Sequence, residues 1–204
     1  MIDPIPGIII LEGADSSGKS TLATCLRAKY GARYIHCGLY QNPLVWHQVA
    51  LRRAIRLGKH ELCVVDRHWP SHLIYGSVFN NQKYEDEARE LDRQFREACA
   101  LIVLCVPGSA SRQEQDWLRD KGNGKKEHFT SVREVIALYA DLAYGNVANP
   151  APGYLGELIR FQDFAERPDV TLYDRYEWDG RVEAYARGLI KKVESLRYGK
   201  TAVI

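Results

Sequence analysis

The sequence predicts an α/β fold in which a doubly wound parallel sheet of five strands carries helices on both faces. Five short runs rich in β-branched and other apolar residues are spread along the chain, and most lack the alternation of a half-exposed strand. Such continuous runs indicate strands buried on both faces. Helical patterns separate the runs, as connections between parallel strands require. With 204 residues, the chain is expected to form one domain, 1–204.

The predicted strands are bounded by turn-forming or charged residues. In chain order they are GIIILEG, RYIHCG, ELCVVDR, ALIVLCVP and DVTLYDR, at 7–13, 33–38, 61–67, 100–107 and 169–175. In a doubly wound sheet the ligand binds at the carboxyl ends of the strands, so the residues that follow these runs are the candidates for function.

Two helices are predicted from apolar residues that recur every three or four positions. The first covers 43–58, and its predicted buried stripe consists of Leu44, Val45, Val49, Ile55 and neighbouring apolar residues. The second covers 179–196, for which Asp179 is a candidate N-cap. By the same criterion two segments look less ordered, the small, polar and basic 107–129 and the Gly-, Pro- and Asn-rich 145–156.

The chain has 28 Lys and Arg against 26 Asp and Glu. This near-balance lacks the overall charge excess that is typical of proteins binding nucleic acids or membranes. Any basic surface must be local, and Arg52, Arg53 and Arg56 lie largely off the apolar stripe of the first helix. The five cysteines form no Cys-x-x-Cys pair and lie mostly in apolar runs, so we expect reduced core residues. No run approaches the roughly 20 apolar residues of a membrane span.

The strongest motif is GADSSGKS at 13–20, which fits G-x-x-x-x-G-K-[ST] between a buried strand and a helix. Its glycines let backbone N–H groups wrap phosphates, its lysine lies near the β and γ phosphates, and its last hydroxyl suits Mg²⁺. We therefore expect ATP with Mg²⁺. The expected nucleotide-binding residues are Gly13, Ser16, Ser17, Gly18, Lys19, Ser20 and Thr21.

A second motif, VVDRHWPSHLIYG at 64–76, ends the third predicted strand with Asp66 and Arg67. A carboxylate there lies beside the phosphate loop, where it holds Mg²⁺ together with Ser20 or accepts a proton from an attacking hydroxyl. The planar guanidinium of Arg67 suits a phosphate. His36, at the end of the second strand, points toward the same face and is a candidate acceptor contact. The histidines and cysteines show no metal-ligand spacing, so the nucleotide's Mg²⁺ is the only metal expected.

At these residues the chain resembles the thymidylate kinase family and its deoxynucleoside kinase relatives. EGADSSGKST matches the family's phosphate loop, and Asp66, Arg67, His68, Ser71 and Tyr75 have the spacing of its D-R-[YH]-x-x-S-x-x-x-Y motif. The later segment WLRDKGNGKKEHFTSVREVIALYADLA matches the family's lid and following helix weakly. The resemblance implies a P-loop NTPase fold of the nucleoside monophosphate kinase type, with a lid at about 108–131. The segment at about 145–168 is an insertion that has no counterpart in that family.

The resemblance also implies roles for single residues. Asp15 contacts the acceptor's sugar, Arg67 grips the acceptor and transferred phosphates, and Ser71 and Tyr75 lie on the acceptor side. Arg119 is the lid cation over the γ-phosphate, with Arg112 and Lys121 as competitors. The phosphate loop of this chain contains no arginine. The lid is therefore expected to supply the positive charge.

Three functions stay open. The first is a kinase of deoxypyrimidine nucleoside monophosphates, whose acceptor is already ionised and needs no base. The second is a kinase of a hydroxyl, either on a deoxynucleoside or on 5-hydroxymethyluracil in phage DNA, which needs Asp15 or Asp66 as a base. The third is an NTP-binding module without enzymatic activity. A small nucleotide is the expected partner, with DNA and a homodimer as further options and no membrane, and the expected location is the cytoplasm, the host's if a phage encodes the chain.

Overall fold

The sheet of the computed structural model has five parallel strands in the order β2-β3-β1-β4-β5. The structure describes residues 5–37, 43–79, 85–121, 129–144 and 166–199. The strands are β1 (Gly7–Glu12), β2 (Arg33–His36), β3 (Leu62–Asp66), β4 (Leu101–Cys105) and β5 (Val170–Tyr173). The predicted doubly wound fold and its five strands are confirmed, each strand ending at or within its predicted bounds.

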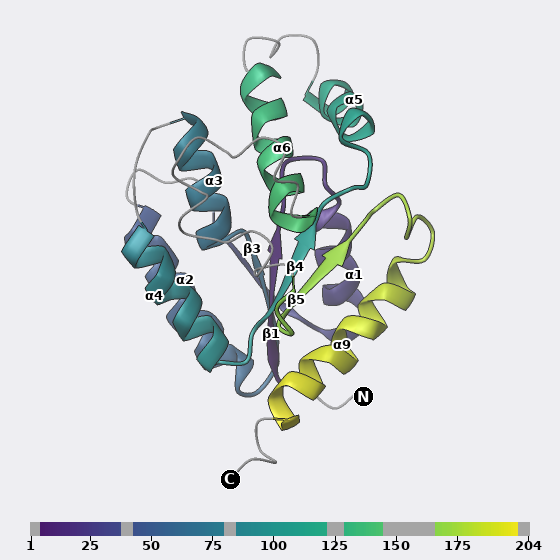
Figure 1. Ribbon diagram of the computed structural model, residues 1–204. Helices are drawn as coiled ribbons and strands as arrows, with labels where there is room; N and C mark the ends of the chain where they lie inside the picture. The colour runs from purple at the N-terminus through teal and green to yellow at the C-terminus, as the bar shows by residue number, and fades with distance from the viewer. Residues whose placement is uncertain (1–4, 38–42, 80–84, 122–128, 145–165, 200–204) are drawn as a thin grey trace.

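Helices cover both faces of the sheet (Figure 1). One face carries α1 (Lys19–Tyr30) and α9 (Val182–Gly199). The other face carries α2 (Pro43–Gly58), α3 (Trp69–Phe79), α4 (Glu85–Glu97) and α6 (Phe129–Tyr144). Helix α5 (Ala110–Lys121) packs on α6 beyond the carboxyl ends of the strands. None of the described helices is long and apolar enough to cross a membrane.

The central strand β1 shows why the apolar runs are continuous. Ile9 and Leu11 pack under α1 and α9, whereas Ile8 and Ile10 pack under the helices of the opposite face. Because successive side chains of a strand point to opposite faces, burial on both faces removes the polar positions from the run. The two layers of helices therefore follow from the uninterrupted GIIIL sequence.

The predicted buried stripe of α2 is partly wrong. The helix has its predicted bounds, but Val45 and Val49 are about half exposed, at 53% and 48%. The buried face is formed instead by His47, Ala50, Leu51 and Ala54, while Ile55 is partly buried. A polar histidine thus occupies a core position, which shifts the buried stripe around the helix from where hydrophobicity alone puts it. The side chain of Leu44 is outside the described residues.

Two further expectations need correction. Most of 107–129 looked less ordered, yet Ala110–Lys121 is a helix whose buried residues are Gln113, Asp116 and Trp117. Residues 122–128 of the predicted lid and 145–165 of the predicted insertion lie outside the described residues. The C-terminal helix begins at Val182 rather than at 179, after a turn in which Gly180 has a φ of 68°, so Asp179 is not its N-cap.

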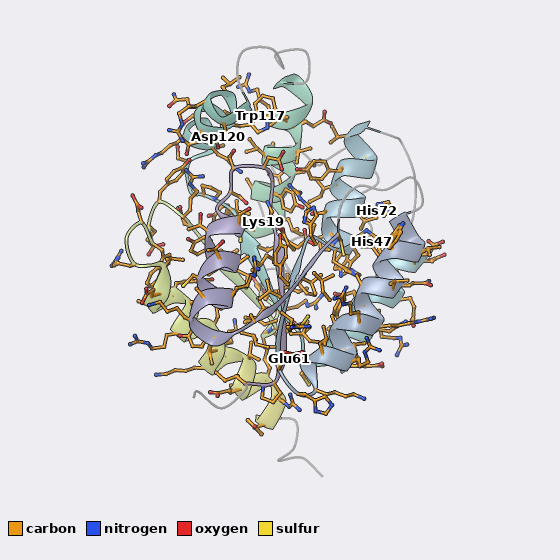
Figure 2. All side chains as sticks on the ribbon, turned by 180° about the vertical axis from the view of Figure 1, so that it is seen from behind. Lys19, His47, Glu61, His72, Trp117 and Asp120 are labelled. Atoms are coloured by element: carbon orange, nitrogen blue, oxygen red, sulfur yellow. The ribbon has the colours of Figure 1, made fainter. Side chains whose placement is uncertain are left out.

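The connections place the functional loops at one end of the sheet. The chain leaves β1 toward α1 on one face, and leaves β3 and β4 toward helices of the other face. Loops from neighbouring strands therefore diverge at the carboxyl ends of β1, β3 and β4 and leave a crevice there. Figure 2 shows Lys19 at this end, below Trp117 and Asp120 of α5, with Glu61 at the opposite end of the sheet.

Candidate active site

The phosphate loop connects β1 to α1 and needs glycine at two positions. Gly13 has a φ of 152° and Gly18 a φ of 93°, a region that side chains rarely adopt. A Cβ at Gly13 would lie 2.3 Å from the carbonyl oxygen of Cys105, and one at Gly18 would lie 2.8 Å from Cβ of Arg175. Both glycines are therefore required by close packing against the ends of β4 and β5 as well as by backbone shape.

Lys19 is held inside the loop. Its Nζ donates to the carbonyl oxygens of Gly13 at 2.8 Å and Ala14 at 2.7 Å, and to Oγ of Ser17 at 3.2 Å. The side chain is buried, and burial together with the nearby charge of Arg67 lowers the pKa of Lys19 to about 8. The lysine is thus positioned and ready to exchange loop acceptors for phosphate oxygens.

Asp66, the last residue of β3, presents a carboxylate to the same crevice. Its Oδ2 accepts a hydrogen bond of 2.5 Å from the hydroxyl of Tyr34, and Nδ1 of His36 lies 3.4 Å from the same oxygen. Its Oδ1 is buried and has no partner among the described residues. A buried carboxylate oxygen without a partner indicates a ligand, since buried acceptors are otherwise satisfied.

Arg67 follows Asp66 and faces the same crevice because its backbone is left-handed, with a φ of 67°. Its guanidinium donates to the carbonyl oxygen of Gly13 at 3.2 Å and to Oδ1 of Asp15, and it lies 4.9 Å from the ring centre of Tyr75. Burial opposes its charge, but the surrounding phenols and carboxylates raise the pKa of Arg67, which keeps it protonated. The motif pair Asp66–Arg67 therefore brings a carboxylate and a cation together.

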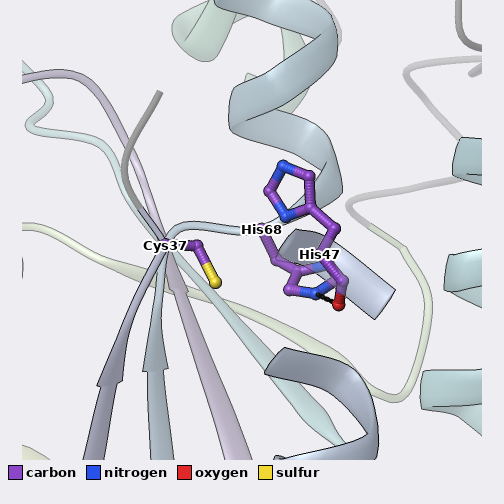
Figure 3. A group of neighbouring side chains, drawn as sticks. All are labelled: Cys37, His47 and His68. Atoms are coloured by element: carbon purple, nitrogen blue, oxygen red, sulfur yellow. Dashed lines mark hydrogen bonds between the residues drawn. The ribbon is translucent and has the colours of Figure 1, made fainter. Parts of the chain in front are cut away.

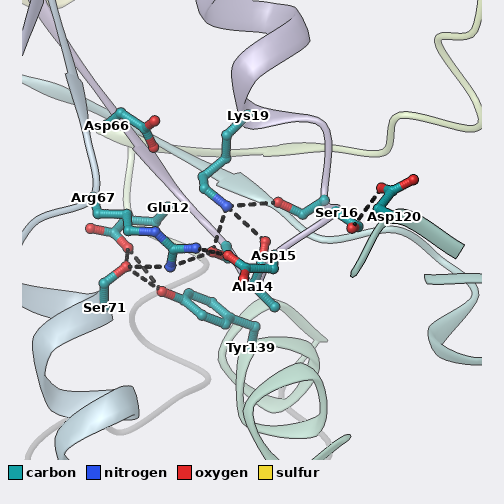
Figure 4. Close-up of polar contacts among 12 residues, drawn as sticks. Glu12, Ala14, Asp15, Ser16, Lys19, Asp66, Arg67, Ser71, Asp120 and Tyr139 are labelled. Atoms are coloured by element: carbon teal, nitrogen blue, oxygen red, sulfur yellow. Dashed lines mark hydrogen bonds and ion pairs between the residues drawn. The ribbon is translucent and has the colours of Figure 1, made fainter. Parts of the chain in front are cut away.

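A buried hydrogen-bond network supports Arg67 from below (Figure 4). Glu12, at the end of β1, is fully buried and accepts from the backbone N–H of His68, from Oγ of Ser71 at 2.6 Å and from the hydroxyl of Tyr139 at 3.0 Å. Burial raises the pKa of Glu12, and the three donors oppose that shift. Ser71 also lies 3.5 Å from Nη1 of Arg67. Ser71 thus positions Arg67, and it does not line the pocket as the resemblance implied.

Helix α5 contacts the loop from the other side. Oγ of Ser16 donates to Oδ2 of Asp120 at 3.1 Å, and Nε2 of Gln113 donates to the carbonyl oxygen of Asp15 at 2.9 Å. Arg119, the expected lid cation, is exposed and pairs with Asp116 at 3.0 Å and Asp120 at 3.6 Å. The structure therefore does not bring Arg119 into the site.

Arg175, just after β5, contacts the phosphate loop and lines the same pocket. Its Nη1 donates to the carbonyl oxygen of Ser16 at 2.8 Å, and its Nη2 pairs with Asp116 at 2.6 Å. The hydroxyl of Tyr176 donates to the same carboxylate oxygen of Asp116 at 2.7 Å. The pocket thus contains a cation that comes from a residue far along the chain from the loop.

These groups surround one pocket of about 560 Å³. It brings together eleven of the residues expected from the sequence, and adds Asp120 and Arg175. The expected residues that line it are Asp15, Ser16, Ser17, Gly18, Lys19, Ser20, Thr21, His36, Asp66, Arg67 and Tyr75. Gly13 contributes through its carbonyl oxygen, which Lys19 and Arg67 both contact.

The residues present fit a magnesium ion. Mg²⁺ prefers oxygen ligands and retains several waters, so a site needs few protein ligands. Ser20 offers a hydroxyl in the pocket, and Asp66 offers the buried Oδ1 that has no partner among the described residues. These two oxygens are the ones that the sequence predicted.

Sequence reasoning missed Glu12, Arg175 and Asp120. A glutamate that closes an otherwise apolar strand was a usable signal for Glu12, because a buried carboxylate needs a polar network. Arg175 also follows a strand, as Arg67 does, and that position could have identified it as a candidate site residue. Asp120 gave no signal, since an acidic residue in a polar helix reads as solvated surface.

Comparison with solved structures finds kinases. The chain is similar to the YorR protein of Bacillus subtilis in complex with phosphorylated GDP, with a TM-score of 0.65, 17% identity and coverage of 94% of this chain and 98% of that one. It is similar to deoxyadenosine kinase from M. mycoides with bound dATP, with a TM-score of 0.55, 17% identity and coverage of 92% and 100%. It is also similar to thymidylate kinase from Candida albicans, with a TM-score of 0.50, 15% identity and coverage of 94% and 92%.

No protein-family model matches the chain, and no curated protein sequence matches it significantly. At 15–17% identity, the structural likeness speaks for the fold alone. The chain therefore has the α/β fold of P-loop nucleotide kinases, with the phosphate loop where the sequence predicted it.

Proposed function

We propose that the chain is a phosphotransferase that moves the γ-phosphoryl group of ATP to a deoxypyrimidine nucleoside monophosphate. The observation that carries the proposal is one pocket in which the Lys19 loop faces the Asp66–Arg67 pair. Such a pocket has a cation for the donor phosphates and a second cation beyond them for an acceptor. A site that only binds an NTP has less need of the second cation.

In this proposal the loop and Arg175 bind the donor. Backbone N–H groups of the loop and the N-terminus of α1 receive the β and γ phosphates, and Lys19 and Arg175 add charge where it develops during transfer. Ser20 and Asp66 would hold Mg²⁺, which supplies charge neutralisation at the phosphates. Phosphoryl transfer needs mainly positioning and electrostatic stabilisation, and these residues supply both.

The acceptor side favours a substrate that is already an anion. Arg67 is buried and charged there, and its forked guanidinium suits a phosphate. Asp15, the alternative base, is itself paired with Arg67, so its charge is engaged in the site. A nucleoside monophosphate, largely ionised above a second pKa of about 6, needs no base. The deoxyadenosine and thymidylate kinases among the structural neighbours support a nucleotide or nucleoside acceptor.

One observation favours a second candidate, a hydroxymethylated base in DNA. On the α1 side of edge strand β2 lies an open pocket of about 700 Å³ lined by Arg27, Arg33 and Arg53. Tyr34 also lines it, below Arg27 at 5.5 Å, and the hydroxyl of that tyrosine reaches Asp66 in the proposed active site. Three arginines beside the site would suit a polyanionic acceptor. Phosphate contacts of this kind dominate binding of nucleic acids.

The deciding experiment follows label from γ-labelled ATP into dTMP, thymidine, and DNA with or without 5-hydroxymethyluracil. Label in dTMP is the expected result. Label only in the modified DNA would replace the leading proposal with the second candidate. Absence of transfer to every acceptor, despite ATP binding, would favour the NTP-binding module.

Matched variants sharpen both outcomes. Lys19→Ala is expected to abolish transfer, whereas Lys29→Ala on the exposed side of the same helix is expected to leave it unchanged. For a DNA acceptor, Arg27→Ala with Arg53→Ala is expected to raise KM and flatten its dependence on salt. Arg52→Ala with Arg56→Ala is the control, because neither residue lines the basic pocket.

A further inference from the structure

Three buried side chains that can ligate a metal meet beside the site but take no part in it. They are Cys37 at the end of β2, His47 on α2 and His68 just before α3 (Figure 3). One ligand atom from each lies within 4.8 Å of one from each of the others. In Figure 3 the Cys37 thiol points from the strand end toward the two imidazoles. Three separate elements thus contribute one ligand each.

The hydrogen bonding of His68 leaves one buried ring nitrogen with a free lone pair. Its Nε2 lies 2.9 Å from the backbone carbonyl oxygen of His47, which can only accept, so Nε2 carries the proton. Nδ1 of His68 is then an acceptor, and it is buried with no partner among the described residues. A ligating histidine commonly donates its other N–H to a carbonyl in this way, which fixes both its tautomer and its orientation.

His47 has the same property. Its Nδ1 is buried without a partner among the described residues, and its ring centre lies 4.6 Å from that of His68. Burial lowers the pKa of His47 to about 3 and that of His68 well below its ordinary value, so both imidazoles are neutral. Neutral imidazoles are the form that binds metals.

Cys37 completes the set as a free, buried thiol. Burial raises its pKa to about 12, so the folded chain alone keeps the thiol protonated. A divalent cation reverses this, because a coordinating thiol is deprotonated outright. Metal binding at this position therefore releases one proton per chain.

We propose that Cys37, His47 and His68 form a binding site for one zinc ion. One thiolate and two imidazoles are the borderline-soft ligands that Zn²⁺ takes, and the absence of a carboxylate among the three disfavours Mg²⁺ and Ca²⁺. Zn–S and Zn–N bonds of about 2.3 and 2.0 Å put tetrahedral ligand atoms about 3.3–3.6 Å apart. The three side chains therefore close by roughly 1 Å on binding, with solvent as the fourth ligand.

Zinc here would tie α2 to the ends of β2 and β3. His68 follows Arg67 directly and Cys37 follows His36, so the ion would brace the acceptor side of the pocket without touching substrate. Zinc binding at this buried cluster does not require the proposed kinase activity.

The test is titration of the chelator-treated full chain with Co²⁺, followed by displacement with Zn²⁺. The expected result is one Co²⁺ per chain, with a near-ultraviolet thiolate-to-cobalt band and tetrahedral visible bands that Zn²⁺ removes and Mg²⁺ does not. Free Zn²⁺ about 100-fold above Kd is expected to raise Tm by roughly 5–10 °C. A titration with no thiolate band would overturn the proposal.

Variants assign the ligands. Cys37→Ala is expected to abolish the thiolate band, whereas Cys63→Ala, which removes another buried free thiol near the start of β3, is expected to retain it. His47→Ala is expected to weaken Co²⁺ binding by more than about 100-fold. A band that survives Cys37→Ala would refute the site, and circular dichroism identifies any variant that fails to fold. If a variant fails to fold, the Co²⁺ titration and the Tm shift of the wild-type chain decide whether the site exists.

Discussion

Tyr139→Phe tests whether Glu12 is an ionised carboxylate that its buried hydrogen-bond donors stabilise. The substitution removes one hydroxyl and leaves the ring, which is 1% exposed, in place. Glu12 loses the donor at 3.0 Å, and Ser71 loses its partner at 2.6 Å. The backbone N–H of His68 and the hydroxyl of Ser71 still donate to the carboxylate. The change therefore removes one of three donors without opening a cavity.

The expected loss follows from these contacts. A hydrogen bond to a charged group contributes about 1.5–3 kcal/mol, and two donors remain, so we expect unfolding free energy to fall by about 2 kcal/mol. For a chain of this size that corresponds to a Tm about 4–8 °C lower. Urea unfolding followed by circular dichroism measures the free energy, and thermal unfolding measures Tm. Tyr198→Phe is the control, since that side chain is 61% exposed, and it should change neither quantity.

A result near zero would refute this reasoning. Burial raises the pKa of Glu12, so the competing view is that the folded chain carries Glu12 protonated. A protonated carboxyl needs fewer donors, and Tyr139→Phe would then cost less than about 0.5 kcal/mol, as an uncharged and still satisfied network predicts. Repeating the measurement across pH separates the two views, because only the ionised form loses stability with the donor.

Two further predictions concern the donor side. Because Lys19 with a pKa of about 8 binds phosphate in its protonated form, kcat/KM for ATP is expected to fall about tenfold per pH unit above pH 8, and a flat profile to about pH 9.5 would contradict it. Arg175→Ala removes the contacts to Ser16 and Asp116, and is expected to lower kcat/KM for ATP by about 10–100-fold in steady-state assays. Arg181→Ala, an exposed arginine of the same segment, should keep wild-type kinetics, and equal losses in both variants would show a general charge effect.

The strands and the phosphate loop could be predicted because each depends on local sequence. Burial on both faces makes a run such as GIIIL apolar throughout, and a loop that wraps phosphates needs Gly13, Gly18 and Lys19 at fixed spacing. The Asp66–Arg67 pair was also readable, because it directly follows a strand. In these cases the residues that cooperate are neighbours in the chain.

The missed features depend on contacts between distant segments. His47 reads as polar and Val49 as apolar, yet the first is buried and the second is half exposed, because the neighbours of α2 decide which face is covered. Arg175 joins the loop across 159 positions, and Tyr139 reaches Glu12 across 127. The cluster of Cys37, His47 and His68 likewise has no sequence spacing to detect, since its members come from three separate segments of the chain. The expectation of Mg²⁺ as the only metal rested on that spacing.

Under the proposed function, the hydrogen bond from Ser16 to Asp120 opposes the binding of weakly charged ligands. The carboxylate stands at a loop built to attract anions, so it competes with any phosphate that arrives there. We expect a ligand with a single weak charge to gain little by displacing it, whereas a triphosphate offers the loop enough acceptor oxygens to offset both the lost hydrogen bond and the repulsion by Asp120. Under the proposed function, ATP therefore has to displace Asp120 from Ser16, so this contact at the end of α5 favours ligands with several phosphate groups.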